Sequence, residues 1–134
     1  MELKKSYKGL VVWLMLLLGS MLALAFIPVT DEALMIRILL NVCTLELTLL
    51  TYIIYKTGYV YWFTGVNYED AVAVGEERRK LYALKHLNVF GKFSLLLLGY
   101  SLLAHVLGFY FWIDIILMGV GVVSVAISTM KFEL

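Results

Sequence analysis

Charged residues are scarce in this chain. Only 16% of its 134 residues are Asp, Glu, Lys or Arg, and 63% are hydrophobic. In soluble domains about a quarter of the residues are charged. The sequence therefore has too few polar side chains to cover a water-soluble globule, and it predicts a membrane protein. One cysteine and one proline exclude a disulfide scaffold and a Pro-rich linker protein, and a net charge of +1 gives no reason to expect nucleic acid as a partner.

Motifs for common chemistries are also lacking. The sequence has no Gly-rich phosphate loop, no paired metal-ligand spacing and no nucleophile elbow. Cys43 lies alone in an apolar stretch, where it behaves as a small apolar residue. His86 is expected outside the membrane and His105 inside it, so the two cannot form one metal site. We therefore expect no catalytic residue, no cofactor and no metal.

Long uncharged stretches predict membrane-spanning helices. Gly9 to Thr30 lacks any charge and exceeds the ~20 residues that a helix needs to cross the bilayer. Lysines before it and the small residues Ala23-Leu24-Ala25 also fit a signal peptide, but we expect a retained anchor. Pro28 then breaks the chain, and Thr30 or Asp31 can cap the next helix.

The second half of the chain predicts a helical hairpin. Residues 93–130 contain one charge, Asp114, and a single helix of this length would measure about 57 Å, well beyond the ~30 Å hydrocarbon core. The stretch must fold back, and Gly108 is the natural helix terminator. We therefore expect one membrane domain over residues 1–134, with helices at about 9–28, 33–55, 93–107 and 113–130.

The positions of Lys and Arg predict the orientation. They lie in the N-terminal segment, in residues 56–92 and in the C-terminal tail, apart from Arg37. The positive-inside rule then places both termini and residues 56–92 in the cytoplasm. The predicted fold is an all-α, polytopic four-helix membrane bundle with a cytoplasmic amphipathic helix between its second and third spans.

Residues 56–92 are expected to contain that amphipathic helix. Asn67 is a plausible N-cap, and Glu76 and Lys80 have the spacing of a favourable helical pair. Apolar Leu81, Leu84 and Leu87 recur every three residues. The helix is expected to lie on the anionic inner leaflet or to run on past residue 91 into the third span, and a docking surface for a cytoplasmic partner is the alternative. Its basic residues are Arg78, Arg79, Lys80 and Lys85.

Polar side chains fall on one face of each later span. On the second span they lie within about 40° of one line, which indicates a face turned toward protein rather than lipid. The stripe on the second span is Arg37, Asn41, Thr44, Thr48, Thr51 and Tyr55. Those on the third and fourth are Ser94, Ser101 and His105, and Asp114, Gly121, Ser124 and Ser128. Three such stripes predict a hydrogen-bonded bundle seam.

Four of these residues are expected to share the outer half of the membrane. Arg37, Asn41, His105 and Asp114 form the predicted intramembrane polar cluster, with Arg37 paired to Asp114. A structural ion pair is one interpretation. An Arg37 side chain that reaches outward to the membrane surface is the second, and a ligand or proton site is the third.

Glu46 is expected to point away from this stripe. It lies half a helical turn from Arg37 and near the middle of the bilayer, where a charge costs at least ~2.5–3.5 kcal/mol. It is therefore predicted to be protonated or paired, and to face lipid, a second copy of the chain or another membrane protein. A rotated helix would instead bring it toward Ser101 or Ser124. Glu46 is thus the predicted partner or oligomer contact.

One segment resembles known membrane proteins. Its motifs are Trp62-Phe63-Thr64-Gly65-Val66-Asn67, then Glu76-Glu77-Arg78, Tyr82, Leu84-Lys85 and Gly91-Lys92. They resemble a family of small bacterial membrane proteins of unknown function, which usually has tyrosine where Val66 stands here. They are more distantly similar to the SdpI-type membrane immunity proteins. The resemblance implies a bacterial cytoplasmic membrane, and toxin resistance or signalling by membrane contact.

Two functional hypotheses follow. The first is a protein that binds another membrane protein, a second copy of itself or a membrane-active agent, as an immunity or accessory factor. The second is a subunit of a small transporter or channel that uses the polar seam. Hydration distinguishes them, because a transport path needs a water-filled seam. A membrane enzyme would require the cluster of Arg37, His105 and Asp114 to open into a cavity.

Overall fold

The computed structural model describes residues 3–63 and 65–134. Met1, Glu2 and Thr64 lie outside the described residues, and Thr64 is part of the resemblance motif. Within these ranges the chain is helical or irregular, with no strand. Four helices are long and apolar enough to cross a membrane, as expected for a multi-pass membrane protein. The elements are α1 (Lys8–Ala25), α2 (Glu32–Thr57), the 3-10 turn η1 (Val60–Trp62), α3 (Tyr68–Val74), α4 (Glu76–Leu107) and α5 (Phe111–Met130).

Local sequence signals set the helix ends. Asp31 caps α2 by accepting a hydrogen bond from the Leu34 amide at 3.3 Å, and Asn67 caps α3 through the Asp70 amide at 2.8 Å. Gly108 ends α4 with a φ of 73°, a left-handed conformation that glycine adopts without steric penalty. These ends agree with the sequence predictions.

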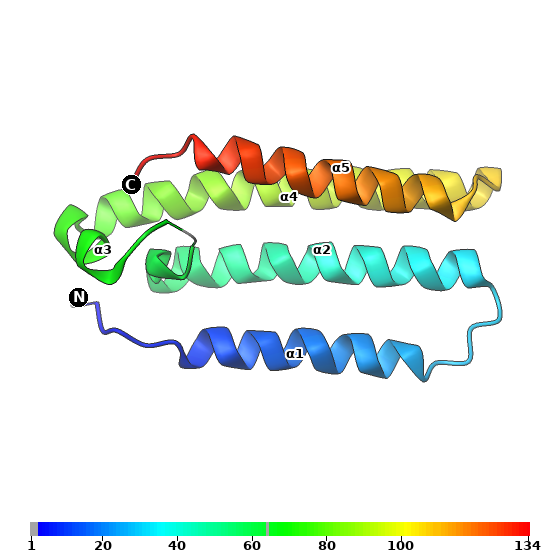
Figure 1. The fold of residues 1–134 in the computed structure, drawn as a ribbon, viewed down its shortest axis with the longest axis horizontal. Coiled ribbons are helices and arrows are strands. Elements are labelled where there is room, and N and C mark those ends of the chain that lie inside the picture. The colour runs from blue at the N-terminus through cyan, green and yellow to red at the C-terminus, as the bar shows by residue number, and fades with distance from the viewer. Residues whose placement is uncertain (1–2, 64) are drawn as a thin grey trace.

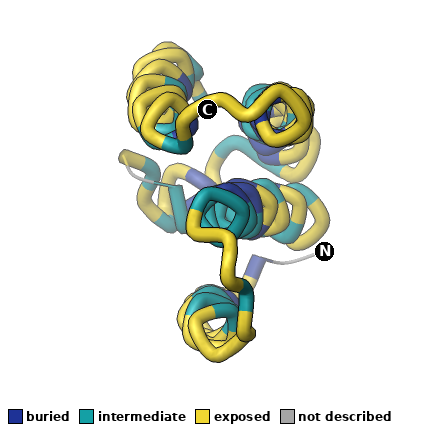
Figure 2. Tube along the Cα trace, turned by 90° about the vertical axis from the view of Figure 1, so that its right-hand side faces the viewer, coloured by how far each residue is buried: buried dark blue, intermediate teal, exposed yellow. Residues whose placement is uncertain are grey.

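The helix α2 lies in the middle of the bundle (Figures 1 and 2). The helices α4 and α5 run side by side along one side of α2, and α1 packs along the opposite side. Both chain ends and α3 lie at the same end of the bundle (Figure 1). We call this the terminal end. The central position of α2 means that two of its faces are covered by protein.

The third predicted span and the amphipathic helix before it form one continuous helix, which is the run-on arrangement that the sequence offered as one of two alternatives. It begins at Glu76 rather than near residue 93, and it continues through Gly91 to Leu107. A glycine inside a helix costs about 1 kcal/mol relative to alanine but keeps its backbone hydrogen bonds, so it does not end a helix rich in Leu, Lys and Glu. At 1.5 Å per residue α4 is about 48 Å long, and it therefore extends beyond a ~30 Å hydrocarbon core.

The first turns of α4 bury a different face from the one predicted. Leu81 and Leu84 are 55% and 36% exposed, whereas Arg79 is 6% exposed. Arg78, Lys80 and Lys85 are exposed, as expected for a basic helix surface. The spacing of the leucines predicted that their face of α4 would be buried. Aromatic and small side chains instead pack against a different face of α4. The residues that α4 buries there are Arg79, Tyr82, Ala83 and His86.

A small core at the terminal end holds the two chain termini. Tyr61 accepts a hydrogen bond from the Ser6 amide at 2.8 Å, and the Trp62 indole donates to the Ser6 carbonyl at 2.9 Å. Near the C-terminus, the Phe132 ring packs edge-on against the His86 ring, with 5.1 Å between the two ring centroids. The buried apolar residues of this core are Leu3, Ile54, Val60, Tyr61, Ala71, Tyr82 and Ala83.

Candidate functional site

An ion pair joins the start of α5 to the first turns of α2. The Arg37 Nε donates to Asp114 Oδ1 at 3.2 Å, and the two residues are 4% and 0% exposed. Asp114 lies in the first turn of α5, where the helix dipole favours a negative charge. Mutual neutralisation at this position reduces the cost of placing both groups in an apolar environment.

The second oxygen of Asp114 continues the network into α4. Asp114 Oδ2 accepts from the Ser101 hydroxyl at 3.1 Å, and Ser101 in turn accepts from Asn41 Nδ2 at 2.9 Å. Asn41 Nδ2 also donates to the Arg37 carbonyl at 2.8 Å. The Asn41 Oδ1 has no partner among the described residues. One chain of polar contacts therefore connects α2, α4 and α5, and we call it the polar network.

His105 lies at the exposed edge of the polar network. Its Nδ1 is 3.4 Å from Arg37 Nη1, and its side chain is exposed. Arg37 Nη2 also donates to the Phe109 carbonyl, just beyond the end of α4. These contacts hold the guanidinium inside the bundle, so Arg37 does not reach outward. The structure thus brings all four predicted cluster residues together, with the Arg37–Asp114 pairing that the sequence predicted.

Sequence reasoning assigned Ser101 to a stripe but not to this cluster. Ser101 precedes His105 by one helical turn, and that spacing was the available signal. The Phe109 carbonyl could not be found from sequence, because a backbone acceptor beyond a helix end carries no side-chain signature.

The threonines of α2 extend the polar face toward the terminal end. Thr44 and Thr51 are buried, and each donates its hydroxyl proton to a carbonyl of the preceding turn of α2. The Thr48 hydroxyl lies 3.0 Å from the Thr44 carbonyl and 3.3 Å from the Phe90 carbonyl of α4. This face therefore packs on α4 with its hydroxyls already bonded inside the protein.

The stripe predicted on α5 is only partly correct. Asp114 is buried as expected, but Ser124 and Ser128 are exposed and Val125 is buried instead. A side chain at Gly121 would come within 2.1 Å of the Phe93 ring of α4. The Phe93 ring thus occupies the space beside Gly121.

Glu46 also differs from its predicted environment. It is 9% exposed rather than open to lipid, and its backbone carbonyl accepts a hydrogen bond from the Trp13 indole of α1 at 2.7 Å. Its Oε2 has no partner among the described residues. Glu46 points away from the polar stripe as expected, but α1 covers this side of α2, so the side chain is not open to lipid. Its role as a partner or oligomer contact stays a prediction.

The polar network consists of an ion pair and hydrogen bonds that hold α2, α4 and α5 together, which is a structural role. Within residues 3–63 and 65–134, no three His, Cys, Asp or Glu side chains gather in a way that could hold a metal ion. Comparison of the chain with protein-family models, curated proteins and solved structures gives no match.

Proposed function

We propose that the protein is a closed membrane bundle that acts by contacting another membrane component through its surface. The observation that carries this proposal is the complete burial of Asp114, whose two carboxylate oxygens are both bonded within the chain. A transport path requires polar groups that water or a solute can reach. Here the polar groups bind one another, which favours a packed seam.

The positions of the cavities support the same proposal. Three cavities of the described chain lie toward the terminal end, and none of the three is lined by Arg37, Asn41, Ser101 or Asp114. A channel subunit would use these residues as pore lining, and an enzyme would use them in a pocket. These three cavities therefore give no support to either alternative.

The exposed serines of α5 suggest where a partner helix binds. Ser124 and Ser128 are one turn apart, so they share a face of a helix whose other polar side chains are Asp114 and Thr129. Small residues let a second helix approach closely, and serine hydroxyls can bond across a helix–helix contact in a membrane. We infer that this face, which we call the serine face, receives a helix of another membrane protein or of a second copy.

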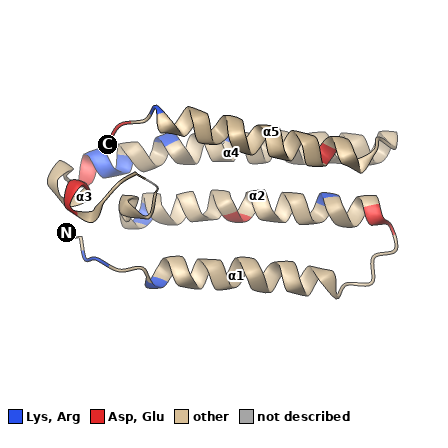
Figure 3. Ribbon diagram, in the orientation of Figure 1, with Lys and Arg blue, Asp and Glu red and all other residues tan. Residues whose placement is uncertain are grey.

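The distribution of charge supports a cytoplasmic terminal end. Lys and Arg gather at the end of the bundle that carries both termini (Figure 3). Under the positive-inside rule that end faces the cytoplasm, which gives N-in and C-in topology. A bacterial cytoplasmic membrane and immunity to a membrane-active toxin stay predictions from the resemblance alone.

Site-specific photo-crosslinking tests the serine face. A photoreactive residue replaces Ser128 in one variant and Val123 in the matched control, which is 58% exposed on a different face of α5. In native membranes we expect a larger cross-linked product only from position 128. The mass of the product distinguishes a second copy from another protein, and equal products from both positions would contradict the proposal.

Water accessibility tests the transport alternative. A Ser101→Cys variant is made in a Cys43→Ala background and treated with a water-soluble maleimide. We expect Ser101→Cys to stay unlabelled, because Ser101 is 5% exposed. A Lys85→Cys control at an exposed position should react fully. Rapid labelling at position 101 would favour a hydrated path instead.

A further inference from the structure

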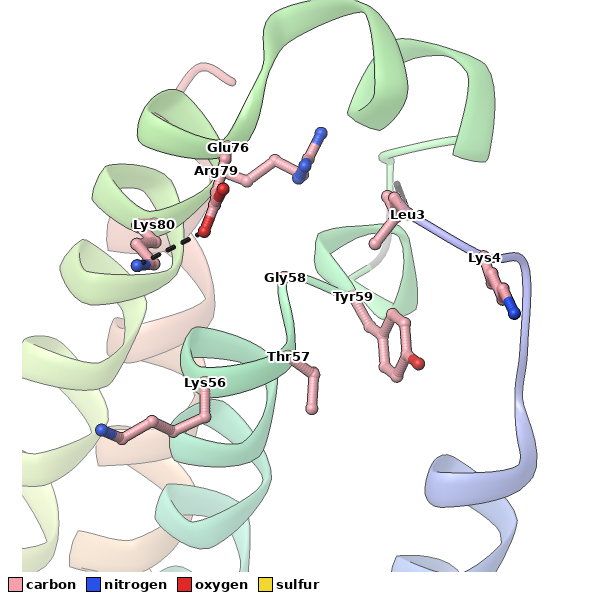
Figure 4. A pocket seen from close by; sticks show the side chains of 9 residues that line it. All are labelled: Leu3, Lys4, Lys56, Thr57, Gly58, Tyr59, Glu76, Arg79 and Lys80. Carbon is pink, nitrogen blue, oxygen red and sulfur yellow. Dashed lines mark ion pairs between the residues drawn. The ribbon is translucent and has the colours of Figure 1, made fainter. Parts of the chain in front are cut away.

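A cavity of about 250 Å³ opens where α2 ends and α4 begins (Figure 4). Because α2 is a candidate membrane span that ends at Thr57, the cavity lies at the level expected for lipid head groups. Its walls come from the N-terminal segment, the end of α2 and the first turns of α4. The lining residues are Leu3, Lys4, Lys56, Thr57, Gly58, Tyr59, Glu76, Arg79 and Lys80.

The lining of this cavity is strongly basic. It includes three lysines and Arg79, against a single acidic residue, Glu76. The Glu76 carboxylate already pairs with Lys80 at 3.5 Å. Figure 4 shows Lys4 and Lys56 extending away from the middle of the cavity, so they form its rim. Their charges add an attraction for anions that approach from the membrane surface.

Arg79 is the unusual member of the lining. It is 6% exposed, and its Nη1 donates to the Ala71 carbonyl at 2.7 Å. Its Nε has no hydrogen-bond partner among the described residues, and no described carboxylate forms an ion pair with it. The guanidinium points from α4 into the space between α4 and Leu3 (Figure 4).

The contrast with Arg37 shows why this arrangement matters. Both arginines are more than nine-tenths buried, but Arg37 has Asp114 as its counter-ion. A buried charge without a paired group is costly, and proteins normally supply a counter-charge for it. At Arg79 the described chain supplies only a carbonyl, so an external anion would complete the site.

Gly58 lies beside the Arg79 guanidinium in the lining of the cavity. A Cβ at Gly58 would lie 3.5 Å from the Arg79 Nε, and the φ of +81° at Gly58 disfavours any residue that has a side chain. Glycine therefore keeps that side of the guanidinium free of a side chain. A guanidinium has parallel N–H donors that match the oxygens of phosphate, which makes phosphate the best-fitting anion.

We propose that this cavity binds a phosphate group, with Arg79 as its main ligand, and that the phosphate belongs to an anionic phospholipid head group. The cavity is slightly smaller than the ~300–1,000 Å³ typical of sites for drug-sized ligands, which suits a head group better than a nucleotide cofactor. Its place at the end of α2 favours a lipid over a free ion. The proposal is independent of the partner contact at the serine face.

Ligand-induced stabilisation of the detergent-solubilised full chain tests the proposal. The probes are dihexanoyl phosphatidylglycerol, dihexanoyl phosphatidylcholine and inorganic phosphate, and affinities come from the rise of the unfolding temperature with probe concentration. We expect phosphatidylglycerol to stabilise the protein and phosphatidylcholine to have no effect. Arg79→Gln should weaken phosphatidylglycerol binding about tenfold, the effect of one charge-assisted hydrogen bond.

Arg78→Gln is the matched control. It removes the same charge one residue away, but Arg78 is exposed and does not line the cavity. We expect it to change the affinity less than about twofold, since screened surface charges contribute little. Equal weakening by the two variants would indicate diffuse attraction to a basic surface and would overturn the proposal.

A second pair of variants covers the case in which Arg79→Gln does not fold. Lys4→Gln combined with Lys56→Gln removes two exposed charges from the rim, and Lys8→Gln combined with Lys85→Gln removes two exposed charges elsewhere. Only the rim pair should weaken binding. Inorganic phosphate that binds as tightly, with the same dependence on the rim, would support the phosphate site and identify free phosphate as its source. No stabilisation by either anion would disprove the site.

Discussion

Arg37 and Asp114 are 77 positions apart in the sequence, and their side chains meet at 3.2 Å. Each lies in the early part of its own helix, and the antiparallel course of α2 and α4 followed by α5 brings these two starts to the same end of the bundle. The ion pair therefore fixes how α5 sits on α2.

Removing one partner of this pair should be more damaging than removing both. Asp114→Ala leaves Arg37 buried and unpaired, and we expect a loss of about 3–5 kcal/mol in the free energy of unfolding. The double variant Arg37→Leu with Asp114→Leu should lose less. Unfolding by a denaturing detergent in mixed micelles measures both.

The surface pair of Glu76 and Lys80 provides the control. Its side chains are 56% and 54% exposed. We expect Glu76→Ala to cost less than ~1 kcal/mol, because solvent screens exposed pairs. A similar loss in the free energy of unfolding for Glu76→Ala and Asp114→Ala would mean that the buried pair does not hold α5 on α2.

Gly121 should tolerate no side chain. A Cβ there would come 2.1 Å from Phe93 Cε2, so Gly121→Ala should destabilise the protein by about 1–3 kcal/mol through overpacking. Gly119→Ala, with nothing within 4 Å of its Cβ, should be neutral or stabilising by up to ~1 kcal/mol. Thermal unfolding of both variants provides the comparison. A Phe93→Ala substitution should restore tolerance at position 121, and failure to do so would place the strain elsewhere.

Glu46 is expected to be replaceable by an apolar residue. Its Oε2 is buried without a described partner, and a carboxyl group inside the membrane is unfavourable. Glu46→Leu should therefore keep or raise the unfolding temperature, while Glu46→Gln should change it little. Size-exclusion chromatography with light scattering reports assembly in parallel. A folded Glu46→Leu protein that loses its assembly state would instead support the role of partner contact predicted from the sequence.

His86 should make the terminal end sensitive to acid. It lies before Lys92, outside the uncharged part of α4, and it stacks on Phe63 at 4.1 Å. Burial lowers the pKa of His86 below its usual 6.5, although the hydrogen bond to the Tyr82 carbonyl acts in the opposite direction. The unfolded chain then takes up the proton first, so the contribution of neutral His86 to stability is present above about pH 6.5 and is lost as pH falls below it.

Limited proteolysis of the C-terminal tail against pH measures this effect. Phe132 packs on His86, so acid should expose the tail. His86→Phe should remove the dependence, whereas His105→Phe, at the other and exposed histidine, should leave it unchanged. A pH dependence that survives in His86→Phe would assign it to another group.

Much of the fold could be predicted because single residues carry strong local signals. Pro28, Asp31, Asn67 and Gly108 mark helix ends through backbone geometry and side-chain capping, and these effects do not depend on distant contacts. The pairing of Arg37 with Asp114 was also predictable, since two opposite charges at one depth in an apolar medium have few other solutions.

The environment of Arg79, Glu46 and Ser124 could not be predicted. Helical periodicity gives the relative directions of side chains on one helix, but it does not say which direction is covered. In a soluble protein, water would mark the uncovered side through polar residues. In lipid, covered and uncovered faces are both apolar, so that signal is weak.

The amino-acid sequence by itself determined an all-helical chain with four apolar helices and most of their ends, and it predicted the pairing of Arg37 with Asp114 as one interpretation. Tertiary structure decided that α2 lies between α1 and the α4–α5 pair, that Arg79 is buried beside a cavity and that the serine face turns outward. The physical reason is that helix formation and insertion depend on local composition. The choice of covered faces depends on the fit of particular side chains, such as Phe93 against Gly121, across helices that are distant in sequence.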